Sequence, residues 1–204
     1  MPTSHTATRS HAATATRTRK APPADAIKLL RADHAEVKKL FAEYDKLAKA
    51  EADASEREAL ALDICNKLTV HAQIEEEIFY PAVRAAIGDD ALVDQAEVEH
   101  ASARELIAEI SAMTPADDQF DAKVIVLGKH IDAHVEEEHS KIFPKAKKAK
   151  VDLKAVGTRL ASRKAKLMEE YHAMARGGEQ HEDENADPVG RPPFEHGHRP
   201  ASRA

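Results

Sequence analysis

The chain has 204 residues, a formal net charge of −6 and a single cysteine, Cys65. Its length suits one domain of roughly 100–200 residues with tails. The negative charge argues against a nucleic-acid-binding protein, and one thiol excludes an intrachain disulfide and a cysteine-only metal site. No apolar run reaches the roughly 18 residues of a membrane span, so a membrane is not an expected partner. Because of the negative net charge, a specific nucleic acid is not an expected partner either. The lone thiol suits a reducing compartment, and we expect a cytoplasmic protein.

Charged residues make up 32% of the chain, glycine is scarce and tryptophan is absent, which favours helices over sheet. The two ends differ from the middle in composition. Residues 1–22 are rich in Thr, Ala and Arg and contain no acid. A transit peptide can look similar, but no large apolar residue follows Met1 there, so a disordered basic tail is favoured. Residues 177–204 are polar and rich in Pro and Gly, and they are predicted to form a disordered polar tail.

Two long helices are predicted in the first half of the remaining sequence. The first starts near residue 24 or 25, after a Pro-Pro pair, and its pattern fades near residue 50. The second opens at a capping-box signal, Ser55 with Glu58, and ends near Gly88. Pro81 should kink or tighten this second helix, because proline cannot continue the regular hydrogen bonding.

Three more helices follow. The third spans about 90–113 and ends at Thr114-Pro115, the fourth covers about 117–148, and a fifth at about 152–176 is expected to pack outside the others. Long helices with short connections predict an all-α fold, an up-down-up-down four-helix bundle over about 24–148 with an additional C-terminal helix. The whole domain is predicted at 23–176.

The middle of the chain is an internal repeat. DHAEVKKLFAE (33–43) aligns with EHASARELIAE (99–109), and HAQIEEEIFYP (71–81) aligns with HVEEEHSKIFP (134–144), both without gaps. Each half therefore reads as a helical hairpin, and two hairpins give a bundle with pseudo-twofold symmetry. At a rise of about 1.5 Å per residue, six matched polar residues on the apolar seams reach one level of the bundle. These residues are His34, His71, Glu75, His100, His134 and Glu138.

Four imidazoles and two carboxylates in an apolar core are costly unless something compensates them. Residues at i and i+4 share a helix face, so each His-x-x-x-Glu can present a nitrogen and an oxygen to one point. Mixed ligands of this kind suit Fe, Mn or Zn rather than Mg or Ca. The six side chains fit two metals better than one, with the glutamates bridging and an oxo or hydroxo bridge from solvent.

Other polar residues near the seams are assigned structural roles. Glu76 and Glu77 are expected to be solvated, and His139 to point away from the site. His130 could add a fifth nitrogen, but an outer or surface position is favoured. Cys65 and Met113 are expected in the core rather than at a redox site, and Tyr80-Pro81 is interpreted as a helix adjustment.

The pattern H…HxxxE…H…HxxxE on four helices resembles the hemerythrin-like, HHE cation-binding family, over about residues 24–148. The IFYP and KIFP endings resemble that family as well. The resemblance implies a non-haem centre of two iron ions that meets O₂, NO or peroxide. It also implies that Glu75 and Glu138 bridge the irons, while the four histidines are terminal ligands.

The ligand balance departs from the classical oxygen carriers, which use five histidines. It is nearer to the di-iron proteins of iron–sulfur repair, although those carry a cysteine-bearing N-terminal domain. The leading hypothesis is therefore a protein that binds or senses O₂, NO or peroxide. The alternatives are an enzyme that consumes peroxide or other reactive species, an iron donor or repair-type protein, and a helical interaction module without metal.

Overall fold

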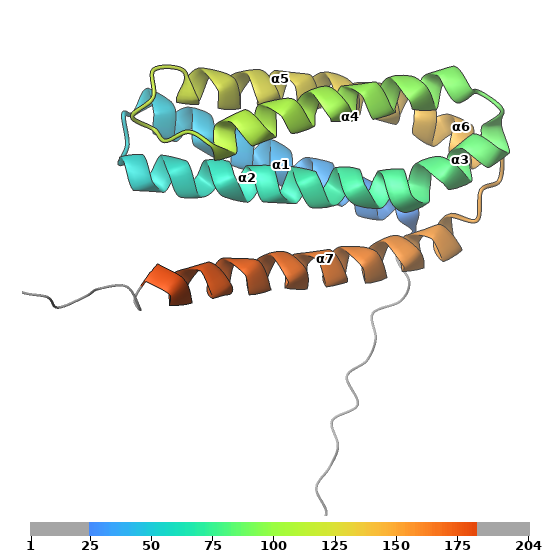
Figure 1. The fold of residues 1–204 in the computed structure, drawn as a ribbon. Coiled ribbons are helices and arrows are strands. Elements are labelled where there is room, and N and C mark those ends of the chain that lie inside the picture. Colours follow the sequence, from blue (N-terminus) through green and yellow to red (C-terminus); the bar gives the residue numbers. More distant parts are fainter. Residues whose placement is uncertain (1–24, 183–204) are drawn as a thin grey trace, which may run out of the picture.

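The computed structural model describes residues 25–182, so the tail predicted at 1–22 and residues 183–204 of the other lie outside the described range. Every regular element in that range is helical (Figure 1). The elements are α1 (Ala26–Lys49), α2 (Ala54–Ile74), η1 (Glu75–Phe79), α3 (Tyr80–Ile87), α4 (Asp90–Ser111), α5 (Phe120–Glu137), η2 (Glu138–Ile142), α6 (Phe143–Lys148) and α7 (Leu153–Glu182). The last helix thus extends past residue 176, its predicted end.

The helices form the predicted up-down-up-down bundle. α1 packs against α2 and α4 against α5, which gives two hairpins, and the contacts α1–α5 and α2–α4 close the bundle (Figure 1). The second rod of the bundle is α2, η1 and α3 in succession, and the fourth is α5, η2 and α6. α7 lies outside the four rods, along α1 and α2, as expected for the additional helix.

Both helices of the first hairpin begin at an aspartate cap. The Asp25 carboxylate accepts hydrogen bonds from the backbone N–H groups of Ile27 and Lys28 at the start of α1. Asp53 caps α2 and accepts from both the backbone N–H and the hydroxyl of Ser55. The capping-box prediction was therefore wrong by two residues, since the residue at the cap is an aspartate with the same acceptor chemistry.

The second and fourth rods each contain one five-residue π-helical turn at the same place in the repeat. The N–H of Tyr80 donates to the carbonyl of Glu75, and the N–H of Phe143 donates to that of Glu138. Pro81 and Pro144 follow directly, and a proline lacks an N–H and crowds the carbonyl four residues back. The predicted adjustment at Pro81 is thus a wide turn that begins at the glutamate of each His-x-x-x-Glu.

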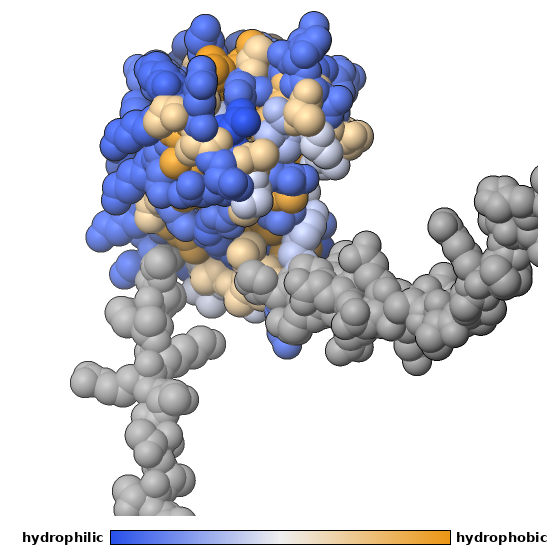
Figure 2. Space-filling model, turned by 90° about the vertical axis from the view of Figure 1, so that its left-hand side faces the viewer, coloured by the Kyte–Doolittle hydropathy of each residue, from blue (hydrophilic) through white to orange (hydrophobic). Residues whose placement is uncertain are grey.

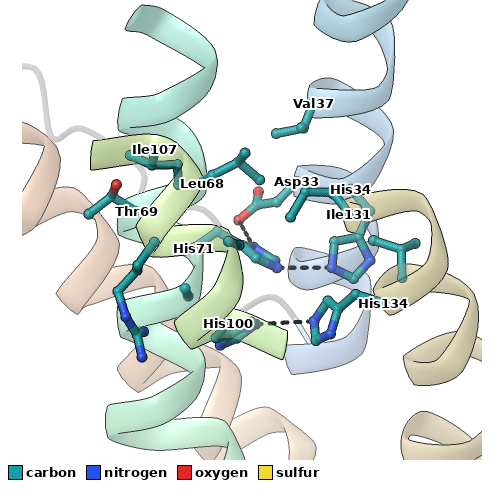
Figure 3. A pocket seen from close by; sticks show the side chains of 14 residues that line it. Asp33, His34, Val37, Leu68, Thr69, His71, His100, Ile107, Ile131 and His134 are labelled. Atoms are coloured by element: carbon teal, nitrogen blue, oxygen red, sulfur yellow. Dashed lines mark hydrogen bonds and ion pairs between the residues drawn. The ribbon is translucent and has the colours of Figure 1, made fainter. Parts of the chain in front are cut away.

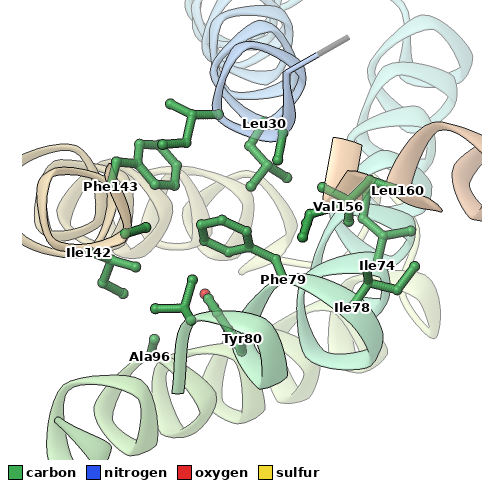
Figure 4. Packing of buried hydrophobic residues seen from close by; sticks show 14 of the residues in the cluster. Leu30, Ile74, Ile78, Phe79, Tyr80, Ala96, Ile142, Phe143, Val156 and Leu160 are labelled. Carbon is green, nitrogen blue, oxygen red and sulfur yellow. The ribbon is translucent and has the colours of Figure 1, made fainter. Parts of the chain in front are cut away.

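The apolar core is divided into two clusters along the bundle axis. One contains Phe79, Tyr80 and Phe143 together with residues of α7 such as Leu160 (Figure 4). The other lies beyond the six polar residues and includes Tyr44, Ile64, Phe120, Leu127 and, as predicted for it, Cys65. His34 lies between Leu30 of one cluster and Val37 of the other, and His100 likewise lies between Ala96 and Ala103. A polar layer therefore crosses an otherwise apolar core.

The outer surface is mostly polar. On the face shown in Figure 2, hydrophilic residues dominate and apolar ones are scattered among them. The helices of residues 25–182 are too short or too polar to cross a membrane.

Candidate metal centre

The structure brings all six predicted site residues into one buried layer. Each histidine is at most 7% exposed, and both glutamates are fully buried. Their nitrogen and oxygen atoms form two groups whose members lie within 4.8 Å of one another and could hold a metal ion. The first group is His34, His71, Glu75 and Glu138, and the second is Glu75, His100 and His134.

The imidazoles face each other in pairs, each pair between the two helices of one hairpin (Figure 3). The Nε2 atoms of His34 and His71 are 2.9 Å apart, and those of His100 and His134 are 3.1 Å apart. Each ring also has a partner at Nδ1, described below. A neutral imidazole that donates from Nδ1 has only a lone pair at Nε2. With both rings neutral, each pair would aim two lone pairs at one another, which a proton or a cation between the rings would resolve.

The two glutamates lie between the histidine pairs. Glu75 Oε2 is 3.2 Å from His71 Nε2 in its own hairpin and 3.5 Å from His100 Nε2 in the other. Glu138 Oε2 is 3.9 Å from His134 Nε2 and 3.3 Å from His34 Nε2. Each carboxylate thus faces one histidine of each pair, which is the placement that a bridging ligand needs.

Three of the four carboxylate oxygens have no hydrogen-bond partner among residues 25–182: both oxygens of Glu75, and Oε2 of Glu138. The close imidazole nitrogens do not meet them with hydrogen-bond geometry. An unpartnered buried carboxylate is costly, and buried charges in proteins are paired or coordinate metals. The residues present therefore fit a centre of divalent cations, which would supply the missing partners.

The electrostatics of the layer favour positive charge at its middle. Burial alone would lower the pKa of His71, but the Glu75 carboxylate and the hydrogen bond to Asp33 outweigh burial and raise that pKa to about 10. Burial would raise the pKa of Glu75, but His71, His100 and His34 together hold it well below its usual range. The carboxylates thus attract a proton to His71, and a metal cation satisfies the same field.

All four histidines have an outer partner at Nδ1. His71 Nδ1 is 3.5 Å from Asp33 Oδ2, and His134 Nδ1 is 2.8 Å from Glu99 Oε2. Asp33 and Glu99 occupy the same position in the repeat, directly before the first-helix histidine. A carboxylate that accepts from Nδ1 fixes the tautomer and ring orientation of a metal-binding histidine. The sequence contained this signal in its aligned DH and EH pairs.

The other two outer partners correct two predictions. Glu76 is half-buried rather than solvated, and its Oε1 lies 3.0 Å from His100 Nδ1 and 2.5 Å from Arg104. His139 does not point away, because its Nε2 lies 3.0 Å from His34 Nδ1. Both residues directly follow a glutamate of the site, where the wide turn rotates them towards the opposite hairpin. Glu77 is exposed, as predicted, and pairs with Arg163.

Tyr80 also belongs to the site, although it was interpreted only as part of a helix adjustment. Its ring stacks on His100, and its hydroxyl donates to Glu138 Oε1 at 3.2 Å. Burial raises the pKa of Tyr80, and the carboxylates of Glu75 and Glu138 raise it further, so the phenol stays protonated. The equivalent residue in the repeat is Phe143, which stacks on His34.

His130 is exposed and belongs to neither of the two possible metal-binding groups.

A small apolar cavity of about 20 Å³ adjoins the histidines. Besides the four imidazoles, its walls include the side chains Val37, Leu68, Ala103, Ile107 and Ile131 (Figure 3). A cavity of this volume has room for about one water-sized molecule. The cavity therefore leaves room for one very small molecule beside the histidines.

One family model, one relative and one solved structure are similar to this chain. Residues 25–146 match the model of the hemerythrin HHE cation-binding domain. A protein named DNA nickase, from Nostoc sp., is 31% identical to this chain over 117 residues. The matched region is 56% of this chain and 31% of that protein, so this chain spans less than a third of its relative. The crystal structure of a hemerythrin HHE cation-binding domain-containing protein from Mycobacterium kansasii superposes with a TM-score of 0.63. The two sequences are 22% identical, and the superposition covers 75% of this chain and 93% of the other. This similarity shows a shared fold. The chain belongs to the hemerythrin HHE cation-binding family.

Proposed function

We propose that this protein holds two iron ions in the polar layer and uses them to bind or sense O₂, NO or peroxide. His34 and His71 would hold one ion, His100 and His134 the other, with Glu75 and Glu138 between them. Iron is favoured over Mg or Ca by the mixed imidazole and carboxylate donors. A bound iron pair would supply the redox and ligand-binding chemistry, and the chain's own residues would position it and exclude bulk water.

The observation that carries this proposal is the apolar cavity of about 20 Å³ beside the four imidazoles. Its apolar walls suit a small uncharged molecule, and its size rejects substrates with more than a few atoms. Asp33 and Glu99 hold the second-helix histidines in position from outside the layer. The rings therefore keep their orientation without help from the small ligand.

The direct test is metal content together with the optical spectrum of protein purified without oxygen. We expect close to two iron ions per chain and a charge-transfer band that changes on adding O₂, NO or peroxide. Less than one metal per chain after iron-replete expression would overturn metal binding. A fully loaded protein whose spectrum responds to none of the three ligands would overturn the ligand-binding role.

A cavity-filling pair of variants sharpens this test. Ala103→Leu places extra methyl groups in the cavity wall and should weaken small-ligand binding while metal loading is kept. Ala101→Leu adds the same groups to the exposed face of α4 and serves as the control. Equal ligand affinity in both variants would show that the ligand does not enter this cavity.

Consumption of peroxide is a second candidate, and the Tyr80 hydroxyl favours it. This phenol lies 3.4 Å from His100 Nε2 and stays protonated, so it can donate a hydrogen bond inside the site. Steady-state peroxide loss that falls in Tyr80→Phe with unchanged iron content would support this activity. No nucleic-acid activity is carried over from the nickase, since the matched region covers 31% of that protein.

A further inference from the structure

The two halves of the repeat differ directly outside the six site residues. In each half, the residue after the site glutamate contacts the first-helix histidine of the opposite hairpin. That residue is Glu76 in the first half, beside His100, and His139 in the second half, beside His34. The repeat thus preserves this contact but changes its chemistry from a carboxylate to an imidazole.

This change leaves the four histidines with unequal outer partners. His71, His100 and His134 each face a carboxylate at Nδ1, from Asp33, Glu76 and Glu99 respectively. His34 alone of the four has an imidazole as its partner at Nδ1. A carboxylate acceptor raises the basicity of the donating imidazole and strengthens it as a ligand. His34 is therefore expected to be the weakest nitrogen donor of the four.

The aromatic residue of each half adds a second inequality in the same direction. Tyr80 stacks on His100 with 5.5 Å between ring centroids and donates to Glu138. Phe143 stacks on His34 with 6.0 Å between centroids but has no hydroxyl to donate to Glu75. The side of His100 is also held from outside, since Arg104 binds Glu76. Its ligands are accordingly fixed by more polar contacts than those around His34.

We propose that the two metal positions are unequal: the one between His100 and His134 is filled first and held tightly, and the one between His34 and His71 is the exchangeable one. This inference rests on the proposed two-metal centre. It assigns the difference to two places where the repeat diverges, Glu76 against His139 and Tyr80 against Phe143. A centre with one exchangeable ion can lose and regain that ion while the other keeps the hairpins together.

The test is anaerobic titration of the metal-free full chain with Co²⁺, followed by its ligand-field absorption, and with ⁵⁷Fe²⁺. The proposal is tested by which position fills first. Two separate binding steps would not be sufficient evidence, because two ions that share the same glutamates could bind in two steps even at equivalent positions. We expect dissociation constants roughly 10-fold or more apart, the scale of changes in outer partners. His34→Ala should keep the tight step and His134→Ala should lose it. A tight step that survives His134→Ala and is lost in His34→Ala would overturn the assignment.

Matched variants at the divergent position test the cause. His139→Glu gives His34 a carboxylate partner and should tighten the weak step roughly 10-fold. Arg31 and Lys38 line the hollow beside His139 and can balance the new charge. Glu76→Gln removes the charge from the partner of His100 and should loosen the tight step, so that both variants bring the two constants together. His139→Gln, a neutral acceptor, should leave the gap as it is.

The outcomes separate this inference from the proposed function. Fewer than two ions per wild-type chain would overturn the two-metal centre itself. Two ions whose constants do not move in either His139→Glu or Glu76→Gln, with helix content intact by circular dichroism, would overturn only the assignment of the inequality to these outer partners. A ⁵⁷Fe sample with one equivalent loaded should show a single Mössbauer doublet, and a one-to-one mixture of two doublets would contradict ordered filling.

Discussion

The two hairpins match in the six site residues and differ in the residues around them. Both provide a histidine, a His-x-x-x-Glu, a π turn at the glutamate and a proline at the same spacing. Outside this set, Glu76 is matched by His139 and Tyr80 by Phe143. The comparison teaches that the two halves keep the side chains that face the buried layer, whereas the contacts behind those side chains differ between the halves.

The additional helix extends this difference. α7 packs along α1 and α2, in the first hairpin. Its Lys164 binds Asp33 at 2.6 Å, and Asp33 in turn faces His71. The equivalent Glu99 is instead held by Gln95, one turn earlier on its own helix. The outer carboxylate Asp33 of the first hairpin is therefore held by a separate helix, and its equivalent Glu99 in the second hairpin by a residue of its own helix.

The largest expected effect is loss of a shared carboxylate, which should affect both halves equally. Glu75→Ala and Glu138→Ala should each lower metal loading 10-fold or more, since each glutamate faces a histidine of both pairs. Loading is measured by mass spectrometry of the metals after purification. Glu77→Ala, two residues away and exposed, is the control. Normal loading in Glu75→Ala would show that this carboxylate does not bridge.

Removal of the metal should destabilise the whole bundle. A ligand that binds only the folded state at 100 times its dissociation constant contributes about 2.7 kcal/mol. Metal-free protein should keep most of its helical signal but unfold at lower urea concentration, because the carboxylates of the layer lose their partners. Urea titrations with and without metal measure the difference. Identical midpoints would indicate that the layer is stable without a cation.

The next largest effect concerns the matched outer carboxylates. Asp33→Ala and Glu99→Ala should each weaken metal affinity roughly 10-fold, by releasing the ring orientation of His71 or His134. Metal competition against a chelator of known affinity gives the two values. If one of the two variants keeps wild-type affinity, the corresponding hairpin orients its histidine by packing rather than by the hydrogen bond.

Exchange of the aromatic pair should have a smaller effect on stability. Tyr80→Phe leaves Glu138 Oε1 without its donor and should destabilise the metal-free protein by about 1–3 kcal/mol. Phe143→Tyr places the same hydroxyl in the other half, near His34. Thermal unfolding of both variants, with and without metal, measures the cost. A cost for Tyr80→Phe that is the same in loaded and metal-free protein would show that the metal does not take over this oxygen.

The smallest effect is expected for the contact with α7. Lys164→Met keeps the apolar stem that covers the bundle but removes the positive charge beside Asp33. The Asp33 carboxylate itself remains and keeps its contact with His71. Metal affinity should change by a few-fold at most, less than in Asp33→Ala, since partly exposed ion pairs are worth roughly 0–1 kcal/mol. A loss as large as that of Asp33→Ala would show that α7 controls the site.

Most of the fold, and the gathering of six polar side chains in one buried layer, could be predicted from local pattern. The helices followed from apolar spacing, and the site followed from polar residues recurring at matched positions on apolar seams. The outer partners were harder to predict, because a residue next to a seam can face either water or the opposite hairpin. Pro81 and Pro144 signal an adjusted turn around Glu76 and His139, but they do not specify which way the neighbouring side chains face.

The sequence by itself determined the bundle, its two-hairpin repeat and the side chains that face the centre, because these depend on helical periodicity and on the spacing of His and Glu. Only the tertiary structure decided which groups stand behind those side chains. Contacts between hairpins, such as Glu76 with His100 and Tyr80 with Glu138, join residues 24 and 58 positions apart. Their chemistry depends on how two helices rotate against each other, which periodicity within one helix does not specify.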